Sequence, residues 1–217
     1  MATIRSFATP HKGLRNVISK FAFRLGYTDF SDASALKRLK LHGEEMFTLL
    51  NDHVHTENEH TLKHLEERVP GSSAHDLADH EKLEEIQNAL QRQLQELNGQ
   101  ESSEQKHSFY LDFTLFQSKY LEHTDEEERV TEVLLQRHFT DDELIQHRQT
   151  IMKKLDPEML LLWLKYVIPA QRIDESLVML SGLKANAPQP FFNRVLETIG
   201  KEMEPERYKQ LEIKLQE

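Results

Sequence analysis

The sequence predicts an all-helical protein, and three observations support this. Glycine and proline number seven each in 217 residues, whereas charged residues make up 29%, a composition that suits long helices with charged outer faces. Apolar residues recur at the three- and four-residue spacing of helix faces. No segment alternates polar and apolar residues as a half-buried strand does. We therefore expect long helices packed around one core.

Composition excludes several classes of function. The net charge of -10, from 27 basic and 37 acidic residues, argues against nucleic acid as a partner. The absence of cysteine excludes disulfides, thiolate metal sites and a cysteine nucleophile. The N-terminus has no apolar core of signal-peptide length, and no run approaches the roughly 20 apolar residues of a membrane span. We expect a cytoplasmic protein without a membrane partner.

The first expected helix begins at Thr9 and Pro10, with threonine as its cap and proline in its first turn. It ends near Gly26. His11 shares one face of this helix with apolar residues: Leu14, Ile18, Phe21 and Leu25. A single histidine on such a face is more often a core residue than a ligand, so His11 gains meaning only together with other donors.

The second expected helix runs from about Asp32 to Val69, with a kink or break possible at Gly43. Within it, His53 and Glu57 are four residues apart and therefore lie on one face. That face continues the apolar stripe of Leu39, Met46 and Leu50 and extends to Thr61, whereas His55 and Glu59 point away from it. A buried carboxylate beside a buried imidazole indicates a positive ion between them.

Two further long helices are expected, the third from about Ser73. His80 lies on its apolar face and His75 on a different side. After a loop over Gly99–Lys106, the fourth helix runs from about Lys106 to Phe139. It carries one continuous inward stripe: Phe109, Phe113, Phe116, Tyr120, His123, Glu127, Val130 and Leu134. His123 and Glu127 repeat the four-residue spacing of the second helix.

Four helices thus each turn one or two metal-binding side chains inward, as metal sites in helix bundles do. The candidate ligands are His11, His53, Glu57, His80, His123 and Glu127. The other histidines lie off the stripes or near helix ends, and we interpret Glu126 and Glu128 as a solvated face. The Glu-x-x-His pairs Glu57–His60 and Glu104–His107 could suggest a ferritin-like site, but their histidines also lie off the stripes.

The remainder of the chain shows no ligand spacing. Thr140 and Glu143 form the ends of a capping box that opens another helix. Proline residues at 157, 169, 188 and 190 divide the region from about 156 to 217 into short helices. The sequence therefore predicts a bundle over residues 1–150 and a helical extension over residues 151–217 packed on it.

These motifs resemble the hemerythrin-like proteins with an HHE cation-binding domain. The resemblance covers roughly residues 10 to 150. It rests on PHKGLRNVISKF, DHVHTENEHTLKHLEERVPG, ADHEKL and EHTDEEERVTEVLLQRHFTDDEL, and on the order His, His-x-x-x-Glu, His, His-x-x-x-Glu. The tail also resembles that of longer bacterial members.

The resemblance implies an up-and-down four-helix bundle with two iron ions, joined by an oxo or hydroxo bridge. It makes His11, His53, His80 and His123 terminal ligands, and makes Glu57 and Glu127 bridges between the irons. The same donors also suit manganese or zinc. Hemerythrins proper use two histidines four residues apart on the third helix. Here only His80 has that context, because His75 is five residues away.

The expected function is binding or sensing of dioxygen, iron or a related small diatomic or redox ligand, rather than catalysis. The fewer histidine ligands leave more positions open, which makes sensing or redox chemistry at least as plausible as dioxygen carriage. One alternative is a di-iron oxidase or peroxide-consuming enzyme on the same site. Another is a metal-free helical interaction module, which would bury Glu57 and Glu127 without a counter-charge.

Overall fold

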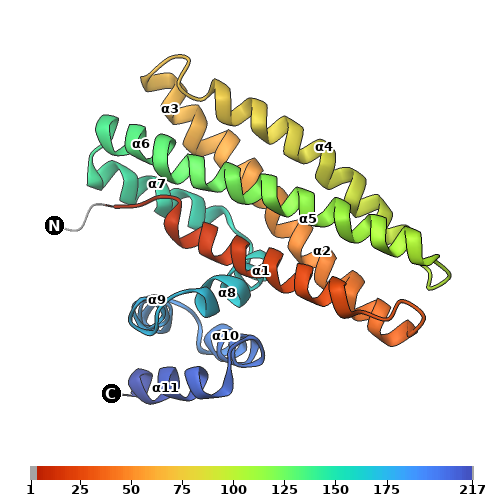
Figure 1. Ribbon diagram of the computed structural model, residues 1–217. Helices are drawn as coiled ribbons and strands as arrows, with labels where there is room; N and C mark the ends of the chain where they lie inside the picture. The colour runs from red at the N-terminus through yellow and green to blue at the C-terminus, as the bar shows by residue number, and fades with distance from the viewer. Residues whose placement is uncertain (1–3, 217) are drawn as a thin grey trace. The chain divides into compact units, whose positions relative to one another are not determined.

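The computed structural model describes residues 4–216, and every regular element in that range is helical (Figure 1). Contacts divide the chain into two compact units. Within the described range, the first comprises residues 4–8 and 17–153, and the second comprises residues 9–16 and 154–216. Helix α1 runs from Ala8 to Tyr27 without interruption and contributes residues to both units.

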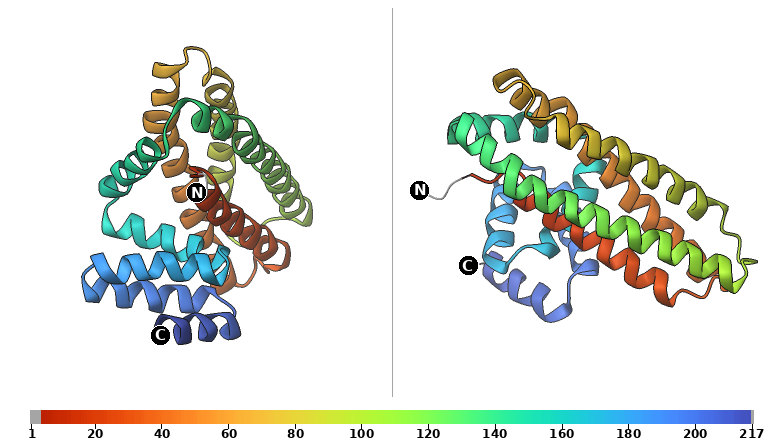
Figure 2. Two further views of the ribbon diagram at one scale, coloured as in Figure 1. Left: turned by 90° about the vertical axis from the view of Figure 1, so that its left-hand side faces the viewer. Right: turned by 45° about the horizontal axis from the view of Figure 1, so that its top comes forward.

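The first unit is built from long helices. After the last part of α1 come α2 (Ala33–Thr56), α4 (Ala74–Glu96) and α5 (Ser103–Glu126). Helix α4 packs against both α2 and α5, and these helices lie side by side in the different views (Figures 1 and 2). Phe21 of α1 meets Phe113 of α5 with ring centroids 4.7 Å apart. The core therefore lies between these helices.

The second and fourth expected helices each contain a π-helical segment, which the sequence analysis did not predict. Helix α2 passes into η1 (Glu57–Leu62) and then α3 (Lys63–Arg68). Helix α5 passes into η2 (Glu127–Thr131) and then α6 (Glu132–His138). Both segments begin at the glutamate of a His-x-x-x-Glu motif. The irregularity in the second helix therefore falls at Glu57 and not at Gly43.

Gly43 serves close packing and does not interrupt α2. It is buried, and an added Cβ would overlap Leu94 Cδ2 and lie 3.0 Å from the ring of Phe21. Glycine at this position therefore lets α2 approach the side chains of α4 and α1.

The π-helical segment also changes which residues of the fourth helix are buried. Val130 was expected on the inward stripe, but its side chain is 51% exposed. Thr131 and Leu135 are buried instead. A π-helical turn holds an extra residue, so the inward face moves by one position after Glu127.

Two helix starts differ from those expected, and hydrogen bonds explain both. Helix α1 has Phe7 and not Thr9 as its N-cap residue, and the Phe7 N–H donates to Glu132 at 3.0 Å. Helix α5 begins at Ser103 and not near Lys106, because Ser102 and Gln105 form a capping box.

Helix α7 (Asp141–Lys154) begins at the predicted capping box. The Glu143 N–H donates to the Thr140 hydroxyl, and the Thr140 N–H donates to the Glu143 carboxylate. The guanidinium of Arg68, followed by Thr140, lowers the pKa of Glu143 to about 2. This helix packs through a small apolar cluster: Phe7, Leu65, Leu135 and Leu144.

The second unit contains the short helices that the prolines predicted. They are α8 (Pro157–Ala170), α9 (Ile173–Asn186), α10 (Gln189–Glu202) and α11 (Pro205–Gln216). Their core is a separate apolar cluster: Leu164, Ile168, Leu180, Phe192, Val195, Ile199, Met203 and Leu211.

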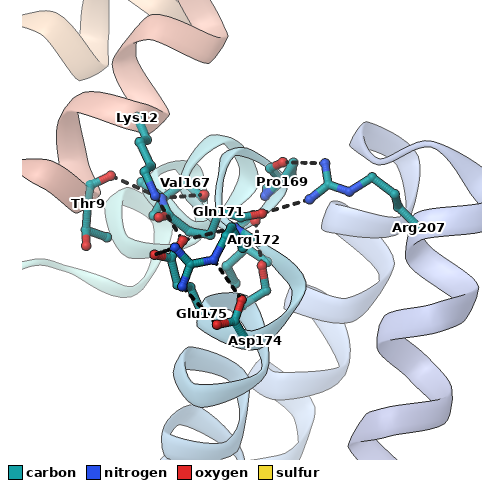
Figure 3. Close-up of polar contacts among 11 residues, drawn as sticks. Thr9, Lys12, Val167, Pro169, Gln171, Arg172, Asp174, Glu175 and Arg207 are labelled. Atoms are coloured by element: carbon teal, nitrogen blue, oxygen red, sulfur yellow. Dashed lines mark hydrogen bonds and ion pairs between the residues drawn. The ribbon is translucent and has the colours of Figure 1, made fainter.

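The α1 residues of the second unit are held by polar contacts (Figure 3). Lys12 Nζ donates to Glu175 at 2.9 Å, and Gln171 Nε2 donates to the Thr9 carbonyl at 3.3 Å. Arg207 of α11 donates to the carbonyls of Pro169 and Gln171 at the end of α8. The contacts of Lys12 and Thr9 join the first turns of α1 to the short helices of the same unit.

None of the helices in the described range has the length and apolar character needed to cross a membrane.

The packing at Gly43 gives a stability prediction. Gly43→Ala should destabilise the protein, because overpacking a core costs about 1–3 kcal/mol and exceeds the gain in helix propensity of about 0.5–1 kcal/mol. Gly182→Ala in α9 is the control, since nothing lies within 4 Å of its added Cβ. It should leave stability unchanged or raise it. Chemical denaturation measures both, and equal stability of the two variants would contradict the packing described.

Candidate metal centre

All six candidate ligands are buried. The exposed fraction is 5% or less for each of them: His11, His53, Glu57, His80, His123 and Glu127. His55 and Glu59 are exposed, so α2 has the rotation expected from its apolar stripe. His75 is also exposed and lies away from His80.

The buried donors form two groups that share both glutamates. One group consists of His11, His53, Glu57 and Glu127, and the other of Glu57, His80, His123 and Glu127. Within each group, one ligand atom from every residue lies within 4.8 Å of the others. Glu57 and Glu127 therefore lie near two pairs of imidazoles. One pair is His11 and His53, and the other is His80 and His123.

The distances between donors match those between ligands of one ion. His80 Nε2 lies 3.4 Å from oxygens of both Glu57 and Glu127. His53 to Glu57 and His123 to Glu127 are both 3.3 Å. Two atoms bound to an ion at about 2.1 Å, with an angle of about 90–110° between the bonds, are about 3.0–3.4 Å apart. Charge-assisted hydrogen bonds are shorter, at about 2.7–2.9 Å.

A hydrogen bond to Asn58 orients one of the imidazoles. His80 Nδ1 lies 2.7 Å from Asn58 Oδ1, an acceptor, so Nδ1 carries the proton and donates it. The lone pair of His80 then resides on Nε2, which faces the two glutamates. Fixing the tautomer through the second ring nitrogen is how proteins commonly orient a metal-binding histidine. Asn58 follows Glu57 in the sequence, but its role could not be recognised from spacing.

The π-helical segments place matching residues around the donors. Glu57 and Glu127 each start such a segment, and π-helical turns often occur at functional sites. Four residues later, Thr61 and Thr131 are both buried. The same Glu-x-x-x-Thr spacing begins at both of these glutamates in the sequence. This repeat could have indicated that both threonines lie near the glutamates.

Asp76 is a buried acid that the sequence analysis missed. It is 4% exposed and accepts a hydrogen bond from the Thr131 hydroxyl at 2.7 Å. Burial raises its pKa, the hydrogen bond from Thr131 opposes this, and the charge of Glu127 adds to the increase. His123 and His80 act in the opposite direction. Asp76 therefore interacts with the buried donors without belonging to either group.

Three other histidines gather outside the buried donors. His64 Nδ1 lies 2.9 Å from His147 Nδ1, and the rings of His60 and His147 are 6.4 Å apart. Burial, and then the neighbouring His64 and His60, lower the pKa of His147 to about 4. His147 is therefore neutral near pH 6, where an exposed histidine is largely protonated.

His42 was expected to lie off the apolar stripe, but it is buried. Its ring lies 5.7 Å from that of Phe21. It belongs to neither group of donors, so it is a core histidine.

Comparison of the chain with models of known families, with curated proteins and with solved structures found no match. The chemistry of the site therefore rests on its own residues. Imidazole nitrogens and carboxylate oxygens together are donors for iron, manganese and zinc. The residues present fit such a cation, because two buried glutamates in close proximity need positive charge.

The rotation of α2 gives the second prediction. His53→Ala and His123→Ala should each remove most of the bound metal, because each deletes a buried donor. His55→Ala is the matched control on the same helix, and it should leave metal content nearly unchanged because His55 is exposed. Elemental analysis of the purified variants measures this. Metal loss in His55→Ala with retention in His53→Ala would mean that Glu59 and not Glu57 faces the metal.

Proposed function

We propose that this chain is a hemerythrin-like protein that holds two iron ions and binds or senses dioxygen or a related small redox ligand. In this proposal α1, α2 with α3, α4, and α5 with α6 form an up-and-down four-helix bundle around the irons. The short helices α8 to α11 form an extension to it.

One observation carries the proposal: both groups of buried donors contain both Glu57 and Glu127. A carboxylate has two oxygens and can join two cations. Two shared carboxylates between two pairs of imidazoles are the donor set that a dinuclear centre requires. A single ion would leave one pair of imidazoles without a function at the site.

The residues divide naturally between the two ions. His11 and His53 would bind one ion, and His80 and His123 the other, with Glu57 and Glu127 binding both. Four imidazoles and two carboxylates do not fill the coordination of two iron ions, so positions are left for a small ligand. The bound irons would supply the redox chemistry, while Asn58 orients His80 and the buried surroundings limit access of water.

A redox enzyme on the same centre is the nearest alternative, because the open positions would serve it equally well. It differs in one measurable respect, since it consumes oxidant repeatedly when a reductant is added. A metal-free interaction module is less favourable physically. It would keep Glu57 and Glu127, at 3% and 0% exposure, close together with no cation between them.

The proposal predicts that protein expressed with added iron contains about two irons per chain. It should also absorb in the near ultraviolet as an oxo-bridged pair of irons does, and the absorption should change between anaerobic and aerobic solution. Elemental analysis and optical spectra measure these properties. A colourless protein without iron would contradict the proposal, and sustained consumption of oxidant would favour the enzyme.

Replacing both bridging residues provides a control. Glu57→Gln with Glu127→Gln should abolish iron binding and the absorption. Because the change also removes the repulsion between the carboxylates, the variant should melt no lower than metal-free wild-type protein. A clearly lower melting temperature would show that these glutamates have structural roles unrelated to metal.

A further inference from the structure

A second group of mixed donors lies at the surface of the first unit. It consists of His75 and Asp79 on α4 and Glu126 at the end of α5. His75 Nε2 lies 3.0 Å from a Glu126 oxygen and 3.5 Å from an Asp79 oxygen. The three side chains are 61%, 24% and 41% exposed, respectively. Solvent ions can therefore reach this group, which we call the outer group.

The outer group differs from an ordinary surface ion pair. Arg129 and Asp125, for example, form a pair between two side chains on one helical surface, and such pairs contribute only about 0–1 kcal/mol. His75 instead faces one carboxylate from its own helix and one from α5. Among residues 4–216, this is the one exposed set in which three or more histidine or acidic donors converge closely enough to hold an ion.

The outer group also adjoins the buried donors along both helices. Asp79 directly precedes His80, and Glu126 directly precedes Glu127. On α4 and on α5, which lie side by side (Figure 1), adjacent residues therefore turn one donor outward and one inward.

Asp76 connects the two sets of donors. It follows His75 in the sequence, but it is buried. Its carboxyl group accepts a hydrogen bond from the Thr131 hydroxyl. Its charge acts on His75 on the outer side. On the inner side it interacts with Glu127, His123 and His80. Asp76 is thus a buried carboxyl group that directly follows an outer donor in the sequence and interacts with the buried donors.

We propose that His75, Asp79 and Glu126 form a second metal site, which captures a divalent cation from solution and passes it inward past Asp76. A cation that binds here displaces any proton on the His75 imidazole. The two carboxylates and the deprotonated imidazole then carry a charge of -2 that complements such a cation, and these donors suit Fe²⁺ or Mn²⁺. Binding of a cation at the outer group does not depend on the buried centre. The inward transfer rests on the proposed function.

The loading rate tests the transfer. Asp79→Asn with Glu126→Gln keeps side-chain shape and removes two donors. Glu81→Gln with Glu122→Gln is the matched control, because it removes the same charge from exposed positions on the same two helices. Metal-free full-length variants are mixed anaerobically with Fe²⁺, quenched with a chelator at successive times and analysed for bound iron.

The outer variant should load about tenfold more slowly than wild type, the scale on which local charge changes capture rates. It should reach the same final iron content, because the buried donors are intact. The control should load at the wild-type rate. Equal rates in the outer and control variants would overturn the transfer, and so would an unfilled buried centre in wild type.

A second measurement tests the outer site alone. Glu57→Gln with Glu127→Gln disables the buried centre, and Mn²⁺ bound by this variant is counted from the loss of the free-ion signal in electron paramagnetic resonance. One Mn²⁺ should bind, and adding Asp79→Asn and Glu126→Gln should abolish this binding. Absence of binding, or binding that survives the added changes, would overturn the outer site. Failure of the proposed function would instead leave this outer ion in place.

Discussion

The arrangement of the first unit depends on two glutamates that are buried next to one another. Removing a carboxylate from water costs several kcal/mol even after the protein relaxes, and Glu57 and Glu127 are 3% and 0% exposed. The Nε2 atom of His80 lies 3.4 Å from an oxygen of each, too far for strong hydrogen bonds. The π-helical turns begin at these glutamates, and the hydrogen bond that His80 donates to Asn58 turns the other ring nitrogen of His80 toward them.

Within the second unit, contacts with the short helices hold the first turns of α1. Residues 9–16 of α1 include His11, and they are held by Glu175, Gln171 and the Tyr166 carbonyl. Gly13 permits this approach, because an added Cβ would lie 3.1 Å from the Val167 backbone. The turn of α1 that carries one candidate ligand is thus fixed by the short helices of its own unit, and this would limit the movement of His11 when metal binds.

Much of the fold and of the candidate site could be predicted from the sequence, because helix faces and helix starts depend on residues close together in the chain. Helical periodicity predicted the burial of His53 and the exposure of His55, and the capping residues Thr140 and Glu143 correctly marked a helix start. The predicted start of α1 was wrong, because the helix begins after Phe7, whose N–H donates to Glu132 from a distant part of the chain. Val130 was misplaced because a regular period does not reveal a π-helical turn. Asp76 and Asn58 were missed, since their roles arise from contacts between helices.

Anomalous X-ray diffraction from crystals of the iron-loaded protein would show whether Glu57 and Glu127 bind two iron ions. Data collected on both sides of the iron absorption edge locate each iron independently of the protein coordinates. The account predicts two neighbouring iron positions, each contacted by oxygens of Glu57 and Glu127, with His11 and His53 at one and His80 and His123 at the other. A single iron position, or irons bound away from these glutamates, would contradict it.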